Sequence, residues 1–286
     1  MEKEILEKYK KSKEISDSVL IFSRNFVKGG ARILELAEKI EERIKKLGGG
    51  IAFPVNISIN ENAAHYTPDI NDSIVLKEGD LVKVDFGVHI DGYIWDRAFS
   101  ILIGEKSELI EAAEKAVENA IKMIKPGVKV CEISEIVENT VSEFSLRPIY
   151  NLSGHGLERF IQHAEPTIPN SKNNIQYEIK EGQAIAMEVF TTKGIGLVKE
   201  SGQILIYAHL QDRPVRMWEA RKILEKAKTE FNGMPFAKRW LTDIATGAKL
   251  ELALKQLVDR NALKSYSVLK EESNSPVAQA EETLIV

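Results

Sequence analysis

Apolar residues recur at helical intervals through the first part of the chain. From Ile5 to roughly Leu47 they are spaced three or four positions apart, with one break at Gly29-Gly30. This spacing places an apolar stripe along one face of a helix, and paired glycines interrupt helices. The pattern therefore predicts two amphipathic helices separated by a turn.

After the glycines at positions 48–50 the pattern changes to short β-rich runs. Residues 80–87 (DLVKVDFG) and 93–103 (YIWDRAFSILI) flank Asp91-Gly92, a dipeptide typical of tight hairpin turns. We expect these two runs to form a β-hairpin.

The next segments repeat the first ones. When Lys28-Gly29-Gly30 is set against residues 125–127 (KPG), acidic and apolar residues of the two helical segments coincide, and Asp85 falls opposite Glu188 in the strands that follow. Two ordinary helix-then-strand units could share this pattern by chance. The matched acids favour two α/β halves related by a pseudo-twofold axis, with a pocket where they meet.

Helical spacing returns from about Asp212 to Lys264, and the last residues, Val277 to Val286, have a β-strand pattern. A helical insert therefore separates the last strand from the sheet that it completes. We predict a catalytic domain at 1–209 and 265–286 and a helical insert subdomain at 210–264.

Composition narrows the class of protein. With 286 residues, of which 43% are hydrophobic, the chain can bury a large core without disulfides, and Cys131 is its only cysteine. Neither an intrachain disulfide nor a cysteine-based zinc site is available. The charged N-terminus lacks the apolar region of a signal peptide, no apolar run is long enough to span a membrane, and the net charge of −4 gives no footprint for nucleic acid. We predict a cytoplasmic protein.

Four acids lie inside β-rich runs, where acidic residues are disfavoured. Asp85 and Asp96 are about equally far from the hairpin turn, which would bring them side by side, and Glu188 and Glu281 lie in AIAMEVF and VAQAEETLIV. Each acid alone could pair with a neighbouring base, Lys83 or Arg97 in the case of the two aspartates, or point into solvent. Together the four are more typical of metal ligands.

His155 lies between two glycines in SGHGLERF, and an imidazole there could add a nitrogen ligand to the carboxylates. Four carboxylates around one divalent ion would leave excess negative charge, whereas two ions balance them. Two ions about 3.5–4 Å apart suit the hydrolysis of an amide bond. We predict two divalent ions per chain, and the residue types do not choose among cobalt, manganese, iron and zinc.

These residues, with the surrounding AAHYTP, VDFGVHIDGYIWD, SGHG, AMEVF and QAEETLIV, resemble the pita-bread-fold metallopeptidases over about residues 20–286. The helical insert with its FAKRWL segment is similar to the type 2 methionine aminopeptidases, in their short archaeal form. The resemblance implies an α/β (α+β) pita-bread fold around a dinuclear site. It also implies removal of the initiator methionine from new proteins with a small second residue.

The resemblance also implies roles for the five ligands. Asp96 and Glu281 would bridge the two ions, Asp85 would complete the shell of one, and His155 with Glu188 would complete the shell of the other. Glu188 would also carry protons during catalysis.

Four further residues match the family in pocket positions. His65 would lie near the scissile nitrogen, His163 would stabilise the oxyanion, and Phe53 and Tyr266 would wall the methionine pocket. Each of these histidines could instead be an ordinary loop residue, and each aromatic ring a core residue. His89 and His209 match no motif.

The chain departs from the family beside the last ligand. The family usually has Phe-Glu-His there, whereas this chain has Ala280-Glu281-Glu282, which puts the neighbouring pocket shape in question. Two other functions stay open: an X-Pro dipeptidase on the same fold, and a metal-free binding module at the ribosome or on RNA. As partners we expect the N-termini of nascent polypeptides, and contact with the ribosome is left open. We expect no association with a membrane, and we expect a monomer.

Overall fold

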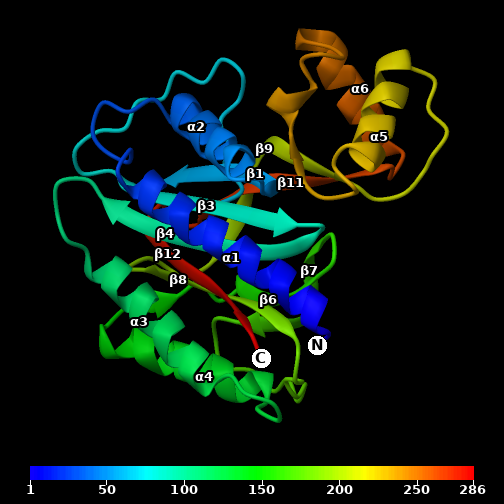
Figure 1. Cartoon of the computed structure of the whole chain (residues 1–286). Helices are drawn as coiled ribbons and strands as arrows, with labels where there is room; N and C mark the ends of the chain where they lie inside the picture. The colour runs from blue at the N-terminus through cyan, green and yellow to red at the C-terminus, as the bar shows by residue number, and fades with distance from the viewer.

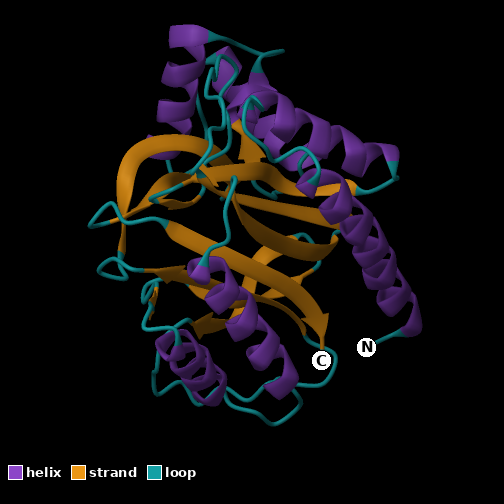
Figure 2. Ribbon diagram, turned by 90° about the vertical axis from the view of Figure 1, so that its left-hand side faces the viewer, coloured by secondary structure: helices purple, strands orange, loops and turns teal.

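The computed structural model covers residues 1–286, and Figure 2 shows its helices packed above and below a central layer of strands. An eight-stranded sheet runs in the order β1-β3-β4-β12-β8-β6-β7, with β5 paired to β8. A four-stranded sheet runs in the order β10-β9-β11-β2. The strands of the large sheet are β1 (Gly50–Ile59), β3 (Leu81–Ile90), β4 (Tyr93–Leu102), β5 (Arg147–Pro148), β6 (Ser153–Glu158), β7 (Ile161–Pro169), β8 (Ala184–Thr192) and β12 (Val277–Ile285).

Two helices cover each half of the large sheet. In Figure 1, α1 (Lys3–Arg24) and α2 (Ile33–Lys46) lie over β1, β3 and β4, and α3 (Glu108–Met123) and α4 (Val130–Glu143) lie on the β8 side. The apolar stripes of α2 and α4 are fully buried at Ile33, Ile40, Ile133 and Val137. Each half therefore has its own hydrophobic core, which agrees with the predicted internal repeat.

The strand β12 joins the two halves. It pairs with β4 of the first half and with β8 of the second half, both antiparallel. Asp85 is the fifth residue of β3, and Glu188 is the fifth residue of β8. The two acids therefore occupy equivalent positions in β3 and β8, as the internal repeat predicted.

The predicted hairpin is formed by β3 and β4, which pair without interruption from Leu81↔Leu102 to Ile90↔Tyr93. Asp91 and Gly92 both have positive φ, 53° and 84°, as a two-residue turn of this hand requires. The register differs from the expected side-by-side acids: Asp85 lies opposite Ala98, and Asp96 lies opposite Gly87. Asp85 and Asp96 are thus diagonal neighbours on one face of the hairpin.

The insert packs around its own hydrophobic core and lies at one end of the molecule in Figure 1. Besides the predicted helices it contains a short strand, and β11 begins at Leu263, two residues before the expected boundary. Its elements and the remaining strands of the small sheet are β2 (Asn62–Ala64), β9 (Val198–His209), α5 (Trp218–Thr229), β10 (Phe236–Ala237), the 3-10 helix η1 (Lys238–Leu241), α6 (Gly247–Asp259) and β11 (Leu263–Glu271).

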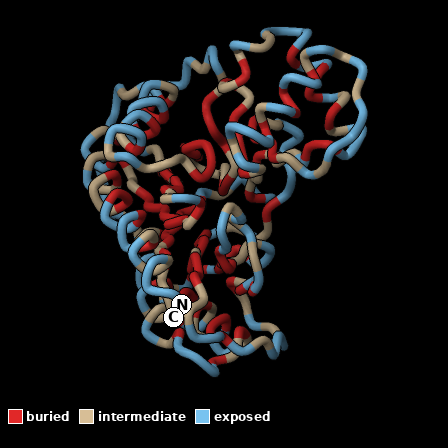
Figure 3. The backbone as a smooth tube through the Cα atoms, turned by 45° about the vertical axis from the view of Figure 1, so that its right-hand side comes forward, coloured by how far each residue is buried: buried red, intermediate tan, exposed pale blue.

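Buried residues follow the strands through the middle of the molecule, and exposed residues follow the outer helices and loops (Figure 3). No helix combines the length and the apolar character needed to cross a lipid bilayer.

Candidate metal centre

The four strand acids lie on four consecutive strands of the large sheet. The strand order β3-β4-β12-β8 carries Asp85, Asp96, Glu281 and Glu188 in turn. Glu281 is directly opposite Glu188 on one side and opposite Ala98 on the other. The small side chain of Ala98 leaves room for the carboxylate between the two halves, so residues distant in the sequence meet at one place.

His155, on β6, adds a nitrogen to this group. Its Nε2 lies 4.0 Å from Asp96 Oδ2 and 3.9 Å from Glu188 Oε1, and ligand atoms of Asp96, His155 and Glu281 lie within 4.8 Å of one another. The His155 Nδ1 faces the Gly156 carbonyl oxygen at 3.2 Å. Because a carbonyl only accepts, Nδ1 carries the proton and Nε2 is left with its lone pair toward the acids.

Neither neighbouring base neutralises these acids. Arg97 lies on the opposite face of β4, where it pairs with Asp17 and Glu282. Lys83 is buried, and its Nζ donates to the carbonyl oxygens of Asn60 and Val277 at 2.9 and 2.7 Å. The alternative in which these bases pair with Asp85 and Asp96 is therefore wrong.

The acids also keep unused binding capacity. The Oδ1 atoms of Asp85 and Asp96 are buried without a hydrogen-bond partner. Burial raises the pKa of Asp85 to about 7. Burial, and then the charge of the other acids, raises the pKa of Asp96, Glu188 and Glu281 well above the usual range. Such a cluster is costly without cations, and hard oxygen donors with one imidazole suit a divalent metal.

Burial also lowers the pKa of His155 to about 4, so its ring is neutral near pH 7. A neutral imidazole is the form that binds metals. The donor set therefore fits divalent ions in both charge and protonation state.

Three amide side chains hold the carboxylates in place. Asn56 donates to Asp85 Oδ2 at 3.2 Å, Gln162 to Asp96 Oδ2 at 3.3 Å, and Gln279 to Glu188 Oε2 at 3.1 Å. The sequence interpretation did not select these residues. A usable signal was present for two of them, because Asn56 is a polar residue in an apolar strand and Gln279 shares a strand face with Glu281.

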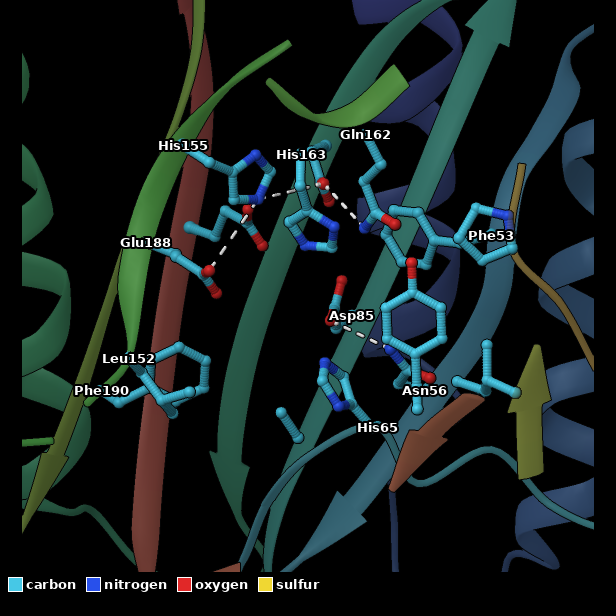
Figure 4. Close-up of a pocket in the computed structure, with 16 residues that line it drawn as sticks. Phe53, Asn56, His65, Asp85, Leu152, His155, Gln162, His163, Glu188 and Phe190 are labelled. Carbon is cyan, nitrogen blue, oxygen red and sulfur yellow. Dashed lines mark hydrogen bonds and ion pairs between the residues drawn. The ribbon is translucent and has the colours of Figure 1, made fainter. Parts of the chain in front are cut away.

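The two other predicted histidines lie beside the acids. Figure 4 shows His65 and His163 on different sides of the space into which Asp85 and Glu188 point. The His163 ring lies 4.5 Å from the His155 ring, and the His65 ring lies 5.6 Å from Tyr266. His65 has a φ of 65°, an uncommon backbone conformation that is often found at functional sites.

Both histidines are held in the neutral form. Desolvation lowers the pKa of His65, and its Nδ1 faces the Ser267 carbonyl at 3.1 Å, which places the proton on Nδ1 and leaves Nε2 as an acceptor. The His163 residue is exposed, yet desolvation and the nearby His155 and His65 lower its pKa. A neutral His163 has one ring N–H to donate.

One pocket contains every predicted site residue. Phe53 and Tyr266 line it together with His65, His163, and the four acids and one histidine of the metal cluster. Apolar residues that the sequence interpretation did not select complete its wall: Ala64, Leu152, Phe190, Ile206 and Pro235. They come from five separate segments, so only the fold brings them together.

The departure beside the last ligand lies outside this pocket. Ala280 packs in the core of the second half. Glu282 accepts a hydrogen bond from Trp95 Nε1 at 2.8 Å and pairs with Arg97 on the other face of the sheet. Neither residue lines the pocket. His89 accepts from the Gly92 N–H at the hairpin turn, and His209 contacts Asp212.

Comparisons with known proteins agree with this geometry. A model of metallopeptidase family M24 matches residues 7–212. The methionine aminopeptidase of Thermococcus onnurineus (strain NA1) is 48% identical over 278 residues, which cover 96% of this chain and 94% of that protein.

Two solved structures share the fold. The methionine aminopeptidase of Thermotoga maritima aligns with a TM-score of 0.72 at 22% identity, over 100% of this chain and 94% of that one. The structure of a thermophilic Arx1 aligns with a TM-score of 0.87 at 18% identity, over 100% of this chain and 89% of that one. The predicted pita-bread fold is confirmed.

Proposed function

The chain belongs to metallopeptidase family M24, and we propose that it is a methionine aminopeptidase that removes the N-terminal methionine from proteins with a small second residue. The observation that supports this most directly is the shared pocket. Metal-competent side chains from five strands, two neutral histidines and an apolar wall all face one space. An apolar side chain can therefore bind beside the atoms that would act on its peptide bond.

We propose that the pocket holds two divalent ions. Asp96 and Glu281 would contact both, Asp85 would contact one, and His155 with Glu188 would contact the other. Two ions would balance the negative charge of the four acids, polarise the amide carbonyl and lower the pKa of a water molecule. The unpartnered Oδ1 atoms of Asp85 and Asp96 support this ligand set.

The remaining roles belong to the side chains of the chain itself. Glu188 would take a proton from the attacking water and pass it to the leaving amine. His65 would lie beside the scissile nitrogen, with Nε2 free as an acceptor, and His163 would donate its ring N–H to the developing oxyanion. Phe53 and Tyr266 would enclose the methionine side chain.

The test is release of free methionine from a Met-Ala-Ser peptide. Metal-stripped protein is reloaded separately with manganese, iron, cobalt or zinc, and Glu188→Gln and an X-Pro peptide are assayed in parallel. The proposal expects metal-dependent release that is lost in Glu188→Gln. Cleavage of only the X-Pro peptide would move the chain to the X-Pro dipeptidases, and no cleavage with any metal would favour the binding module.

The substrate would be the exposed N-terminus of a nascent polypeptide. A cytoplasmic location, a monomeric state and any contact with the ribosome stay predictions.

A further inference from the structure

The junction between β4 and β12 is held in an unusual way. On the side of β12 away from β4, the strand pairs with β8 along its whole length, from Val277↔Thr192 to Ile285↔Ala184. With β4 it forms only two ladder pairs, Glu281↔Ala98 and Glu282↔Arg97. The ladder is therefore shorter between β4 and β12, the strands that carry the proposed bridging ligands Asp96 and Glu281.

Side-chain hydroxyls continue this short ladder at both ends. One register step beyond Glu282↔Arg97, the Asp96 N–H donates to Thr283 Oγ1 at 2.9 Å, and the Thr283 hydroxyl donates to the Asp96 carbonyl at 2.8 Å. Two steps in the other direction from Glu281↔Ala98, the Ser100 hydroxyl donates to the Gln279 carbonyl at 2.7 Å and accepts from the Gln279 N–H at 2.8 Å.

Each hydroxyl thus satisfies both the N–H and the C=O of the residue opposite. An inserted oxygen holds the backbones farther apart than a ladder bond of about 2.9 Å would. The two strands are therefore joined directly at the centre and through a hydroxyl at each end. Thr283 and Ser100 are 2% and 3% exposed, so water does not compete for these bonds.

The residues that the hydroxyls hold belong to the metal cluster or touch it. Asp96 is a proposed ligand to both ions. Gln279 donates from its side-chain amide to Glu188 Oε2 at 3.1 Å. One hydroxyl therefore fixes the backbone of Asp96, a proposed bridging ligand, and the other fixes the backbone of Gln279, whose side-chain amide holds Glu188.

From this geometry we infer that Thr283 and Ser100 are positioning residues, which set the separation of β4 and β12 and thereby the placement of Asp96 and Gln279 around the ions. The inference rests on the proposed metal site. It does not require that the site hydrolyse methionyl peptides.

The test is Mn²⁺ binding to the metal-stripped full chain, measured by isothermal titration calorimetry. Thr283→Val keeps the shape of the side chain and removes the hydroxyl, whereas Thr283→Ser keeps the hydroxyl. Ser100→Ala removes the second hydroxyl. Ser58→Ala is the matched control, because Ser58 is 2% exposed on β1 and its hydroxyl has no partner.

We expect Thr283→Val and Ser100→Ala to weaken Mn²⁺ binding about 10- to 100-fold, the usual effect of removing a group that orients a metal ligand. Thr283→Ser should stay within about threefold of wild type by the same reasoning, and Ser58→Ala should bind normally. Melting of each metal-free variant by circular dichroism identifies a temperature at which all are folded. If Thr283→Val does not fold, Thr283→Ala removes the same hydroxyl without crowding.

Normal Mn²⁺ affinity in a folded Thr283→Val and Ser100→Ala would overturn the inference, even with lowered melting temperatures, because the hydroxyls would then be merely structural. Equal weakening in Thr283→Ser and Thr283→Val would also overturn it, as would a wild-type chain that binds no Mn²⁺. Wild type that binds Mn²⁺ but releases no methionine would contradict the proposed function and leave this inference intact.

Discussion

Glu41 and Glu281 are buried to the same extent, each 6% exposed, but their surroundings are opposite. Glu41, on α2, pairs with Arg239 of the insert and accepts hydrogen bonds from Val55 N–H and Trp240 Nε1. The Glu281 carboxylate has neither a salt bridge nor a hydrogen bond within the chain, and other acids surround it.

The two sites show that burial alone does not identify a functional acid. Arg239 also donates to Thr67 Oγ1 and the Pro68 carbonyl at 2.5 and 3.1 Å, so the Glu41–Arg239 pair joins the insert to the loop that follows His65. Its charges are compensated by the protein itself. The acids around Glu281 lack such compensation, which is what a cation site requires.

The largest effect should follow from removing the uncompensated acid. Glu281→Gln deletes a proposed ligand to both ions, and losing metal assistance of several kcal/mol corresponds to a fall of about a thousandfold or more in kcat/KM. Deleting residues 281–286 should abolish activity, because it removes the ligand and half of β12. Methionine release and metal content of the purified variants measure this. Full activity in the truncated chain would contradict the proposed site.

Breaking the compensated pair should instead affect stability. Arg239→Ala leaves Glu41 buried and unpaired, which costs about 3–5 kcal/mol of unfolding free energy. Mn²⁺ affinity of the folded protein should be unchanged, since Arg239 lies outside the metal cluster. Urea unfolding of the metal-free protein gives the first quantity and calorimetry gives the second. The double change Glu41→Leu with Arg239→Met, which removes both charges, should recover most of the loss.

The acids of the metal cluster should also make the stability of the chain depend on pH. Burial raises the pKa of Asp85 to about 7, and burial with the charge of the other acids raises the pKa of Asp96, Glu188 and Glu281 well above the usual range, so these acids hold protons in the folded metal-free chain that they release in the unfolded chain. The contribution of these acids to stability is fully present below the unfolded pKa of about 4 and is lost as pH rises through the folded pKa, by about 1.4 kcal/mol per pH unit for each extra bound proton. The histidines whose pKa values desolvation lowers contribute in the opposite direction.

Saturating Mn²⁺ should remove this loss, because the ions replace the protons as partners of the acids. Urea unfolding at pH 5, 6 and 7, with and without Mn²⁺, makes the comparison. A stabilisation by Mn²⁺ that does not grow from pH 5 to pH 7 would contradict the argument.

Much of this arrangement was predictable from the sequence, for physical reasons. Helical periodicity gave α1 and α2, and the Asp91-Gly92 turn gave the hairpin. The acids were visible because a carboxylate in an apolar strand breaks the local pattern. The location of each predicted site residue in one pocket agrees with the resemblance, although the individual catalytic and metal-binding roles stay predictions.

The rest depends on long-range pairing that no local pattern encodes. The diagonal offset of Asp85 and Asp96 follows from the register of a hairpin whose turn takes only two residues. Gln279 and Thr283 contact the proposed ligands Glu188 and Asp96 only because β12 lies between β4 and β8. Arg239 contacts Glu41 across 198 positions of sequence, so periodicity could not have linked them.

The smallest effect is expected where the chain departs from its family. Glu282 is an acid adjacent to the proposed ligand Glu281, but its carboxylate points to the other face of β12 and is compensated by Arg97 and Trp95. Glu282→Gln keeps a hydrogen-bond acceptor for Trp95, and Arg97 keeps Asp17 as a partner. We expect a loss of about 1 kcal/mol in unfolding free energy and kcat/KM within about twofold of wild type, because no group of the pocket moves. Peptide kinetics and urea unfolding test both values. A tenfold loss of kcat/KM would mean that the charge of Glu282, on the outer face of β12, affects the metal cluster on the inner face. The contrast between Glu41 and Glu281 would then depend on charges across the sheet as well as on direct partners.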